Sequence, residues 1–183
     1  MSMLRVLVLA TVVGLLSTVP ADAQRAKRKR VSPHETVSEV IDGNKVSVTY
    51  GRPYSKNPRG TDVRKIWGSL VPYGKAWRLG ADEATTIVLE KGIKIGDAAI
   101  PAGSYTLYLI PEENGGKLAF SKTVGRWGIP VDQKHDLVRV DVKKEALSPA
   151  LDQLAIAIEK ADNGGALKIK WEDSQYIVNF TNG

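Results

Sequence analysis

Aromatic and charged side chains that could hold a ligand are concentrated in one glycine- and proline-rich stretch, residues 50–87. Tryptophan and tyrosine rings offer flat apolar faces on which a sugar ring or an aromatic ligand can stack, and arginine offers a planar fork of donors for carboxylate, phosphate or hydroxyl groups. The alternative is that the rings fill one end of the core and the arginines bridge backbone carbonyl groups. The candidate ligand-binding residues are Arg52, Trp67, Tyr73, Trp77, Arg78, Asp82, Glu83 and, from outside the stretch, Trp127.

The adjacent carboxylates Asp82 and Glu83 invite comparison with glycoside hydrolysis, in which two carboxyl groups flank one bond. If both residues lie on a strand that continues through Ile87, their side chains point to opposite faces and do not share a site. We therefore assign no catalytic residue. A hydrolase that uses Glu83 or Asp82 as acid or base, with an arginine to orient the substrate, stays open as an alternative.

Metal and serine chemistry have little support in the sequence. Zinc requires three or four nitrogen or sulfur ligands, whereas the chain has two histidines, His34 and His135, and no cysteine. A calcium site built on Asp132, Asp136 and nearby carbonyl groups is only weakly supported, because calcium requires about six to eight oxygen ligands. No G-x-S-x-G motif marks a serine nucleophile. We expect no metal and no cofactor.

The N-terminus has the pattern of a secretory signal peptide. Arg5 precedes an apolar run over residues 6–19, which ends at Ala21-Asp22-Ala23, so cleavage is predicted between Ala23 and Gln24. The run is shorter than the roughly 20 residues that cross a bilayer, so we expect a signal peptide at residues 1–23 and no transmembrane segment after cleavage. The mature chain is expected in the periplasm or outside the cell.

A basic, flexible leader is predicted at residues 24–36. The net charge is +6; removal of residues 1–23 deletes one arginine and one aspartate, so the charge stays at +6, and five cations of the leader leave +1 for the rest. Like charges without an apolar face are typical of a solvated, disordered segment. Its functional alternative is peripheral contact with an anionic surface, and the export signal argues against nucleic acid. The cations are Arg25, Lys27, Arg28, Lys29 and Arg30.

The remaining residues, 37–183, read as one all-β domain. Val46, Val48 and Tyr50 alternate with polar residues, and Asn-Gly turn signals follow at residues 114–115 and 163–164. Many short strands favour an antiparallel β-sandwich or a jelly-roll-like single domain with at most one or two short helical turns, one of them at residues 62–67. Strands are predicted at residues 46–50, 84–89, 93–95, 104–110, 117–121, 138–142, 154–158, 167–171 and 176–180.

Three motifs carry a resemblance to a known family. They are Trp-Arg-x-Gly-Ala-x-Glu-Ala-Thr at residues 77–85, Ile-Pro-Ala-Gly-Ser-Tyr at residues 100–105 and Arg-Trp-Gly at residues 126–128. With them, the chain resembles, from about residue 46 to residue 180, secreted bacterial proteins catalogued as domain of unknown function 2911. The resemblance implies an export signal and a single β-rich domain, with no assigned activity. The family pattern more often has asparagine where this chain has Asp82, which adds a charge.

The leading hypothesis is a secreted, non-catalytic β-sandwich that binds a small ligand, a glycan or an envelope partner through residues 52–83. Aromatic and cationic residues gathered on a loop-rich stretch motivate it. The hydrolase described above is the alternative from another class. A structural envelope protein held by its basic leader is the third.

Overall fold

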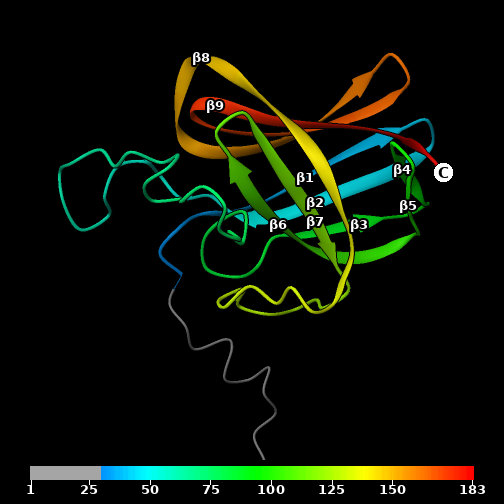
Figure 1. The fold of residues 1–183 in the computed structure, drawn as a ribbon, viewed down its shortest axis with the longest axis horizontal. Coiled ribbons are helices and arrows are strands. Elements are labelled where there is room, and N and C mark those ends of the chain that lie inside the picture. Colours follow the sequence, from blue (N-terminus) through cyan, green and yellow to red (C-terminus); the bar gives the residue numbers. More distant parts are fainter. Residues whose placement is uncertain (1–29) are drawn as a thin grey trace, which may run out of the picture.

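The computed structural model describes residues 30–183, which form a single all-β domain (Figure 1). The predicted signal peptide, its cleavage site at Ala23 and Gln24, and the leader cations before Arg30 lie outside the described residues. The described strands belong to one antiparallel sheet in the order β1-β2-β3-β6-β7-β8-β9-β4-β5. They are β1 (His34–Ile41), β2 (Asn44–Gly51), β3 (Thr86–Leu89), β4 (Ile93–Ile95), β5 (Ala98–Ile100), β6 (Gly103–Glu112), β7 (Gly115–Ser121), β8 (Asp136–Ala161) and β9 (Gly164–Asn182).

The alternation of apolar and polar side chains explains why these segments form strands, and β2 shows this clearly. In β2, Val46, Val48 and Tyr50 are buried, whereas Lys45, just before them, and Thr49, between the last two, are exposed. Because successive side chains of a strand point to opposite faces, one face of β2 packs into the core and the other meets solvent. The all-β class predicted from this alternation is confirmed.

The sheet curls until its two halves face each other across the core (Figure 1). Tyr50 of β2 joins these halves, because its hydroxyl oxygen accepts the backbone N–H of Ile156 in β8 at 2.9 Å and its O–H donates to Glu35 in β1 at 3.0 Å. Burial is the main reason that the pKa of Tyr50 is raised to about 12. The enclosed core therefore resembles that of a sandwich although the sheet is continuous.

Several predicted boundaries were wrong. The two strands predicted at residues 138–142 and 154–158 are parts of one long strand, β8, and those predicted at 167–171 and 176–180 are parts of β9. The pairing of β8 with β9 shifts register between residues 146 and 155, but neither strand ends there. Strand β1 begins at His34, inside the predicted leader, where it pairs with Gly51 at the end of β2. Strand β3 begins at Thr86, two residues after the predicted start.

The helical turn predicted at residues 62–67 is absent, and residues 30–183 contain no helix. The backbone N–H groups of Ile66 and Trp67 donate instead to the carboxylate of Glu172, at 3.2 and 3.4 Å. In a helix over residues 62–67 these two N–H groups would donate to carbonyl groups four residues earlier, so a tertiary partner takes donors that the helix needs, and the weak local preference is overridden.

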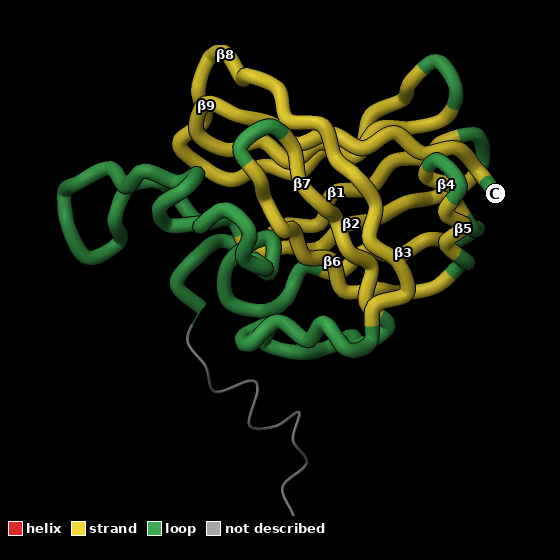
Figure 2. The backbone as a smooth tube through the Cα atoms, viewed as in Figure 1, coloured by secondary structure: helices red, strands yellow, loops and turns green. Residues whose placement is uncertain are grey.

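A long connection, residues 52–85, joins β2 to β3 and gathers with residues 122–135 at one end of the sheet (Figure 2). Its last part crosses directly over the end of β2, where the N–H of Ala81 donates to the carbonyl of Gly51 at 3.3 Å. A Cβ atom on Gly51 would lie 2.1 Å from the Ala81 oxygen. The crossing therefore requires glycine at position 51, and it places residues 80–83 beside the start of β1.

Gly51→Ala tests this crossing. We expect a loss of about 3 kcal/mol or more in the free energy of unfolding, measured by denaturant titration, because a methyl group must displace backbone atoms. Gly96→Ala is the control, since Gly96 has a φ of 56° but open space around its Cβ position, and backbone strain alone should cost about 1 kcal/mol there. Equal losses in the two variants would contradict a tight crossing.

Candidate functional site

The tryptophans of the long connection belong to an aromatic cluster with residues of β9. Trp67 is 3% exposed, and its indole N–H donates to the carbonyl of Trp171 at 3.0 Å. The ring of Trp77 stacks on that of Trp171, with centroids 5.8 Å apart and planes at 23°. Tyr176 packs against Trp67 at 4.8 Å between centroids. Trp67 is thus a core residue, whereas Trp77, which is half-buried, forms the outer layer of the cluster.

The backbone of Trp77 is tied to the sheet. Its N–H donates to the carbonyl of Leu109 in β6 at 2.7 Å, and the N–H of Leu109 donates back to Trp77 at 2.9 Å. Two reciprocal hydrogen bonds of this kind make a short antiparallel bridge. The bridge and the stacking on Trp171 together fix the position of the Trp77 ring.

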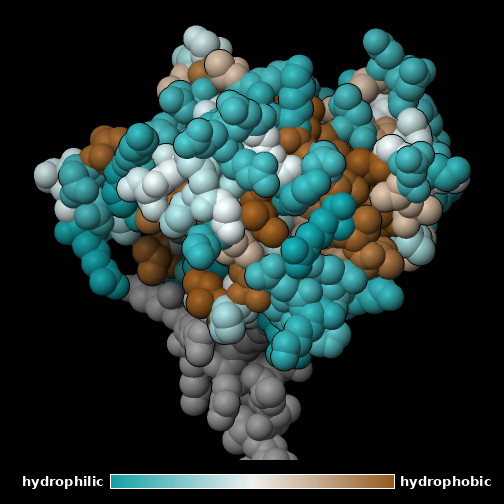
Figure 3. Space-filling model, viewed as in Figure 1, coloured by the Kyte–Doolittle hydropathy of each residue, from teal (hydrophilic) through white to brown (hydrophobic). Residues whose placement is uncertain are grey.

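A cleft of about 330 Å³ lies over this cluster, between the long connection and residues 129–131. Its apolar lining includes two of the more exposed large side chains, Leu70 at 43% and Ile129 at 64%. Figure 3 shows hydrophobic surface among the loops at this end of the molecule. Among the described residues that line the cleft, only Arg64 and Arg78 have polar side-chain groups other than the indole N–H. The other principal lining residues are Val71, Trp77, Val131 and Trp171.

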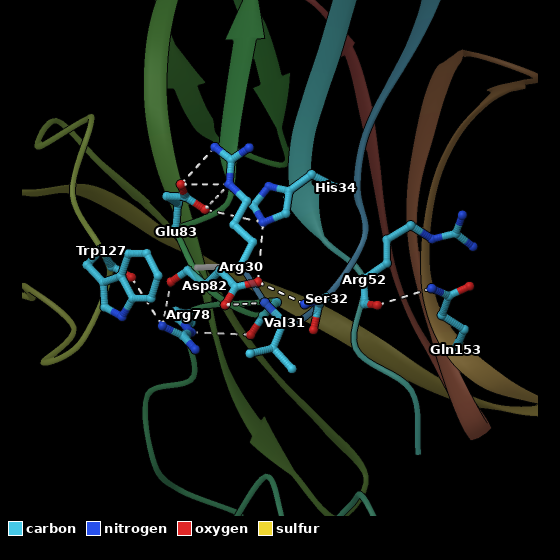
Figure 4. Close-up of polar contacts among 11 residues, drawn as sticks. Arg30, Val31, Ser32, His34, Arg52, Arg78, Asp82, Glu83, Trp127 and Gln153 are labelled. Atoms are coloured by element: carbon cyan, nitrogen blue, oxygen red, sulfur yellow. Dashed lines mark hydrogen bonds and ion pairs between the residues drawn. The ribbon is translucent and has the colours of Figure 1, made fainter. Parts of the chain in front are cut away.

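The guanidinium of Arg78 is directed at backbone carbonyl oxygens, two of which Figure 4 shows joined to it. Its guanidinium donates to the carbonyl groups of Gly80 at 3.4 Å, Asp82 at 2.5 Å and Trp127 at 3.3 Å. Burial lowers the pKa of Arg78, while the nearby charges of Asp82 and Glu83 act in the opposite direction. Arg78 therefore holds the connection to the loop of Trp127 and has acidic neighbours that offset its charge.

Asp82 and Glu83 form, with His34, what we call the carboxylate corner (Figure 4). The corner is a bend before β3, in which Asp82 has a φ of 62°. Both carboxylates reach His34 Nε2, at 3.5 Å from Asp82 and 3.2 Å from Glu83. The condition under which the two side chains would point to opposite faces is not met, because both residues lie before β3, in a bend where strand alternation does not apply.

The first described residues of the chain dock onto this corner. The carboxylate of Asp82 accepts the backbone N–H of Ser32 at 3.1 Å and faces that of Val31 at 3.5 Å. Arg30 donates to both oxygens of Glu83, with the shortest contact at 2.8 Å. Partial burial acts to raise the pKa of Glu83, but the hydrogen bonds and charge of Arg30 outweigh it, and the pKa falls below its ordinary value. The corner thus binds the chain's own N-terminal segment.

Arg52 and Tyr73 lie apart from the cleft lining. Arg52 donates to the carbonyl of Leu154 at 3.1 Å and pairs with Glu35 at 2.9 Å. The hydroxyl of Tyr73 accepts a hydrogen bond from Lys144 at 3.0 Å. Both residues thus join the long connection to strands of the sheet: Arg52 contacts β1 and β8, and Tyr73 contacts β8.

The structure therefore divides the predicted site residues among several places. Trp77 and Arg78 line the cleft, Trp67 lies beneath it, Asp82 and Glu83 form the corner, and Trp127 lines a separate hollow within residues 126–135. Sequence reasoning missed Arg64, Ile129 and Trp171 as cleft residues. Trp171 follows the strand alternation that predicted its burial, but no local signal links any of the three to Trp77.

The acidic residues considered for calcium are engaged with protein partners. Asp132 accepts a hydrogen bond from Lys134 N at 3.1 Å and pairs with His135 at 2.9 Å. The carboxylate of Asp136 accepts the hydroxyl of Tyr108 and pairs with Arg139 at 2.7 Å. Within residues 30–183, no three histidine or carboxylate side chains gather in a way that could hold a metal ion.

Comparison with known proteins yields one family. The profile of the family described as "Protein of unknown function (DUF2911)" matches residues 32–180, a range that contains the cleft, the carboxylate corner and all nine strands apart from the last residues of β9. No curated protein and no solved structure matches the chain significantly. The part of the chain that the structure describes has no helix of the length and apolar character needed to cross a membrane.

Arg30→Gln tests the docking of the N-terminal segment. Removal of this cation should raise the pKa of Glu83, measured by NMR titration of the side-chain carboxyl carbon, because the hydrogen bonds that favour the carboxylate are lost. In the wild type, the pair contributes to stability above the ordinary glutamate pKa of about 4.3 and loses its contribution as the pH falls through the lowered value. Arg59→Gln, an exposed change elsewhere in the long connection, is the control. An unchanged midpoint in Arg30→Gln would contradict the contact.

Proposed function

The chain belongs to the family of unknown function DUF2911, and from this premise we propose that it is an exported, non-catalytic binding protein that holds a small, mainly apolar ligand in the cleft over Trp77 and Trp171. The observation that carries the proposal is an open cleft with an aromatic floor and exposed aliphatic walls. Its volume of about 330 Å³ is at the lower end of the range of roughly 300–1,000 Å³ found for ligand pockets.

The exposed walls support a ligand site more strongly than a structural role. Ile129, at 64% exposure, projects from a loop where a water-facing aliphatic side chain contributes little to folding. Contact with an apolar ligand would remove this surface, together with that of Leu70, from water. Each fully buried aliphatic side chain of this size contributes about 1.5–3 kcal/mol, so two of them supply a useful part of a micromolar affinity of about 8 kcal/mol.

Of the ligand classes considered from the sequence, a small apolar molecule fits this cleft better than a glycan. A sugar ring presents hydroxyl groups on its edge, and these require hydrogen-bond partners once water is excluded. The described lining offers the side chains of Arg64 and Arg78, and Arg78 donates mainly to backbone carbonyl groups. An aromatic or aliphatic body on Trp77 needs no such partners.

The contacts of the carboxylate corner weigh against the hydrolase alternative. A general acid or base must reach a substrate atom, together with a second titratable group. Asp82 is 7% exposed and accepts backbone N–H groups of the N-terminal segment, and Glu83 is bridged by Arg30. Neither residue lines the cleft. Both carboxylates therefore act as docking points for the chain itself in this proposal.

The N-terminal sequence supports a place of action outside the cytoplasm, since the predicted signal peptide would direct export. The predicted leader would then remain attached to the mature domain. Because Arg30 is paired with Glu83, the docked end of the leader has one cation fewer for contact with an anionic surface.

Ile129→Asp tests the ligand cleft. The probe is phenylnaphthylamine, a neutral dye that fluoresces in apolar surroundings, titrated with the wild-type and variant proteins. We expect binding to the wild type and at least about a tenfold weaker affinity in the variant, because a carboxylate would replace an apolar wall. Thermal unfolding should change little, since the side chain is on the surface.

Val63→Asp is the matched control, because Val63 is 73% exposed in the same connection and does not line the cleft. Its affinity for the dye should stay within about twofold of the wild type. Absence of dye binding to the wild type, or equal loss in the two variants, would refute the proposed cleft.

A further inference from the structure

Arg64 occupies the wall between two depressions. It lines the apolar cleft over Trp77 and also a groove of about 460 Å³ on its other side, which includes Lys56 and Asp152, and Pro53 is shared by both linings. A side chain at this position can meet one end of a ligand whose remainder lies in the cleft. The position of Arg64 indicates where one end of the ligand would lie. The contacts of its guanidinium indicate which chemical group could bind there.

Two backbone carbonyl groups orient that guanidinium. Nε donates to the carbonyl of Ser55 at 3.1 Å, and Nη2 donates to that of Tyr54 at 2.6 Å. Arginine has five N–H donors, so most of the donor edge has no partner among the described residues. The half-buried side chain is therefore held in place without its hydrogen-bonding capacity being used up.

The charge of Arg64 also lacks a compensating partner. No carboxylate of residues 30–183 lies within 4.0 Å of its guanidinium nitrogens. The acidic residue in the groove lining, Asp152, accepts hydrogen bonds from Ser55 Oγ and from the backbone of Lys56 instead. An oriented, partly desolvated cation with free donors is well suited to a planar or tetrahedral oxyanion.

Arg78 shows the contrasting case within the same cleft. Its donors contact three carbonyl groups, and Asp82 and Glu83 offset its charge, which is the arrangement of a structural arginine. Two arginines thus line one apolar cleft, and the difference between them assigns the polar end of the ligand to Arg64.

We propose that the ligand is an amphiphilic anion, with its carboxylate, sulfonate or phosphate group on Arg64 and its apolar body on Trp77 and Trp171. This inference rests on the proposed function, since it names the ligand class of the same cleft. Arg64 is then a specificity-determining residue. Its charge-assisted hydrogen bonds favour an anionic ligand over a neutral one with the same apolar body.

A matched pair of dyes tests the inference. Anilinonaphthalene sulfonate and phenylnaphthylamine have the same aromatic body, and only the first carries a sulfonate. The wild type should bind the sulfonate about tenfold to a hundredfold more tightly than the neutral dye, as expected for charge-assisted hydrogen bonds. This preference should shrink as the salt concentration rises.

The variants are Arg64→Gln, Arg64→Lys and, as the matched control, Arg59→Gln, an exposed change in the same connection. Arg64→Gln should lose the preference for the sulfonate and keep its affinity for the neutral dye, which also reports that the cleft is folded. Arg64→Lys should keep part of the preference, since it retains the charge without the planar fork. Arg59→Gln should behave as the wild type.

The outcomes separate the two proposals. Binding of neither dye to the wild type would refute the binding function itself. Equal affinity for both dyes, or an equal preference for the sulfonate in the wild type and Arg64→Gln, would refute the anionic ligand and leave the apolar cleft standing. Loss of neutral-dye binding in Arg64→Gln, with Arg64→Lys also unable to tell the dyes apart, would assign Arg64 a structural role instead.

Discussion

The architecture depends on one anchored side chain, the indole of Trp67. The connection between β2 and β3, residues 52–85, is far longer than the roughly 12–15 residues beyond which loops without strands or helices become uncommon in compact domains. Such a segment must satisfy its backbone groups and bury apolar surface without a ladder of its own. Trp67 provides both, since its ring lies in the core against Trp171 and Tyr176 and its N–H groups find partners on β9.

The position of Trp67 also affects where the ring of Trp77 lies at the surface. Once Trp67 and Trp171 are fixed, Trp77 can stack above them only from the outside, where it bridges to β6 and leaves part of its ring available. The opposing loop contributes Ile129 with most of its side chain in solvent. The apolar surface that lines the cleft is thus the outer layer of an aromatic cluster whose inner layer holds the fold together.

Two arginines of the connection are held differently. The cation of Arg64, in its first half, is oriented by backbone carbonyl groups, whereas the cation of Arg78, in its second half, lies beside the carboxylates of the corner. The corner in turn binds residues 30–32, so a segment that precedes the first strand contributes to the surroundings of Glu83. Among the described residues, the charge of Arg78 is offset at the corner and that of Arg64 is not offset at the cleft, and this asymmetry is the basis for proposing that an anionic group would bind at Arg64.

The sequence by itself determined the all-β class and most strand positions, because alternation and turn residues are local properties of the chain. It also contained the motifs by which the family resemblance was recognised, and the match over residues 32–180 confirms that resemblance. Tertiary structure decided which of the candidate residues meet. The bend at Asp82 brought two adjacent carboxylates to one histidine, where strand alternation would have separated them. The partnership of Trp77 with Trp171, more than ninety residues later, and the absence of an acidic partner for Arg64 among residues 30–183 depend on the arrangement of distant segments, which no local pattern encodes.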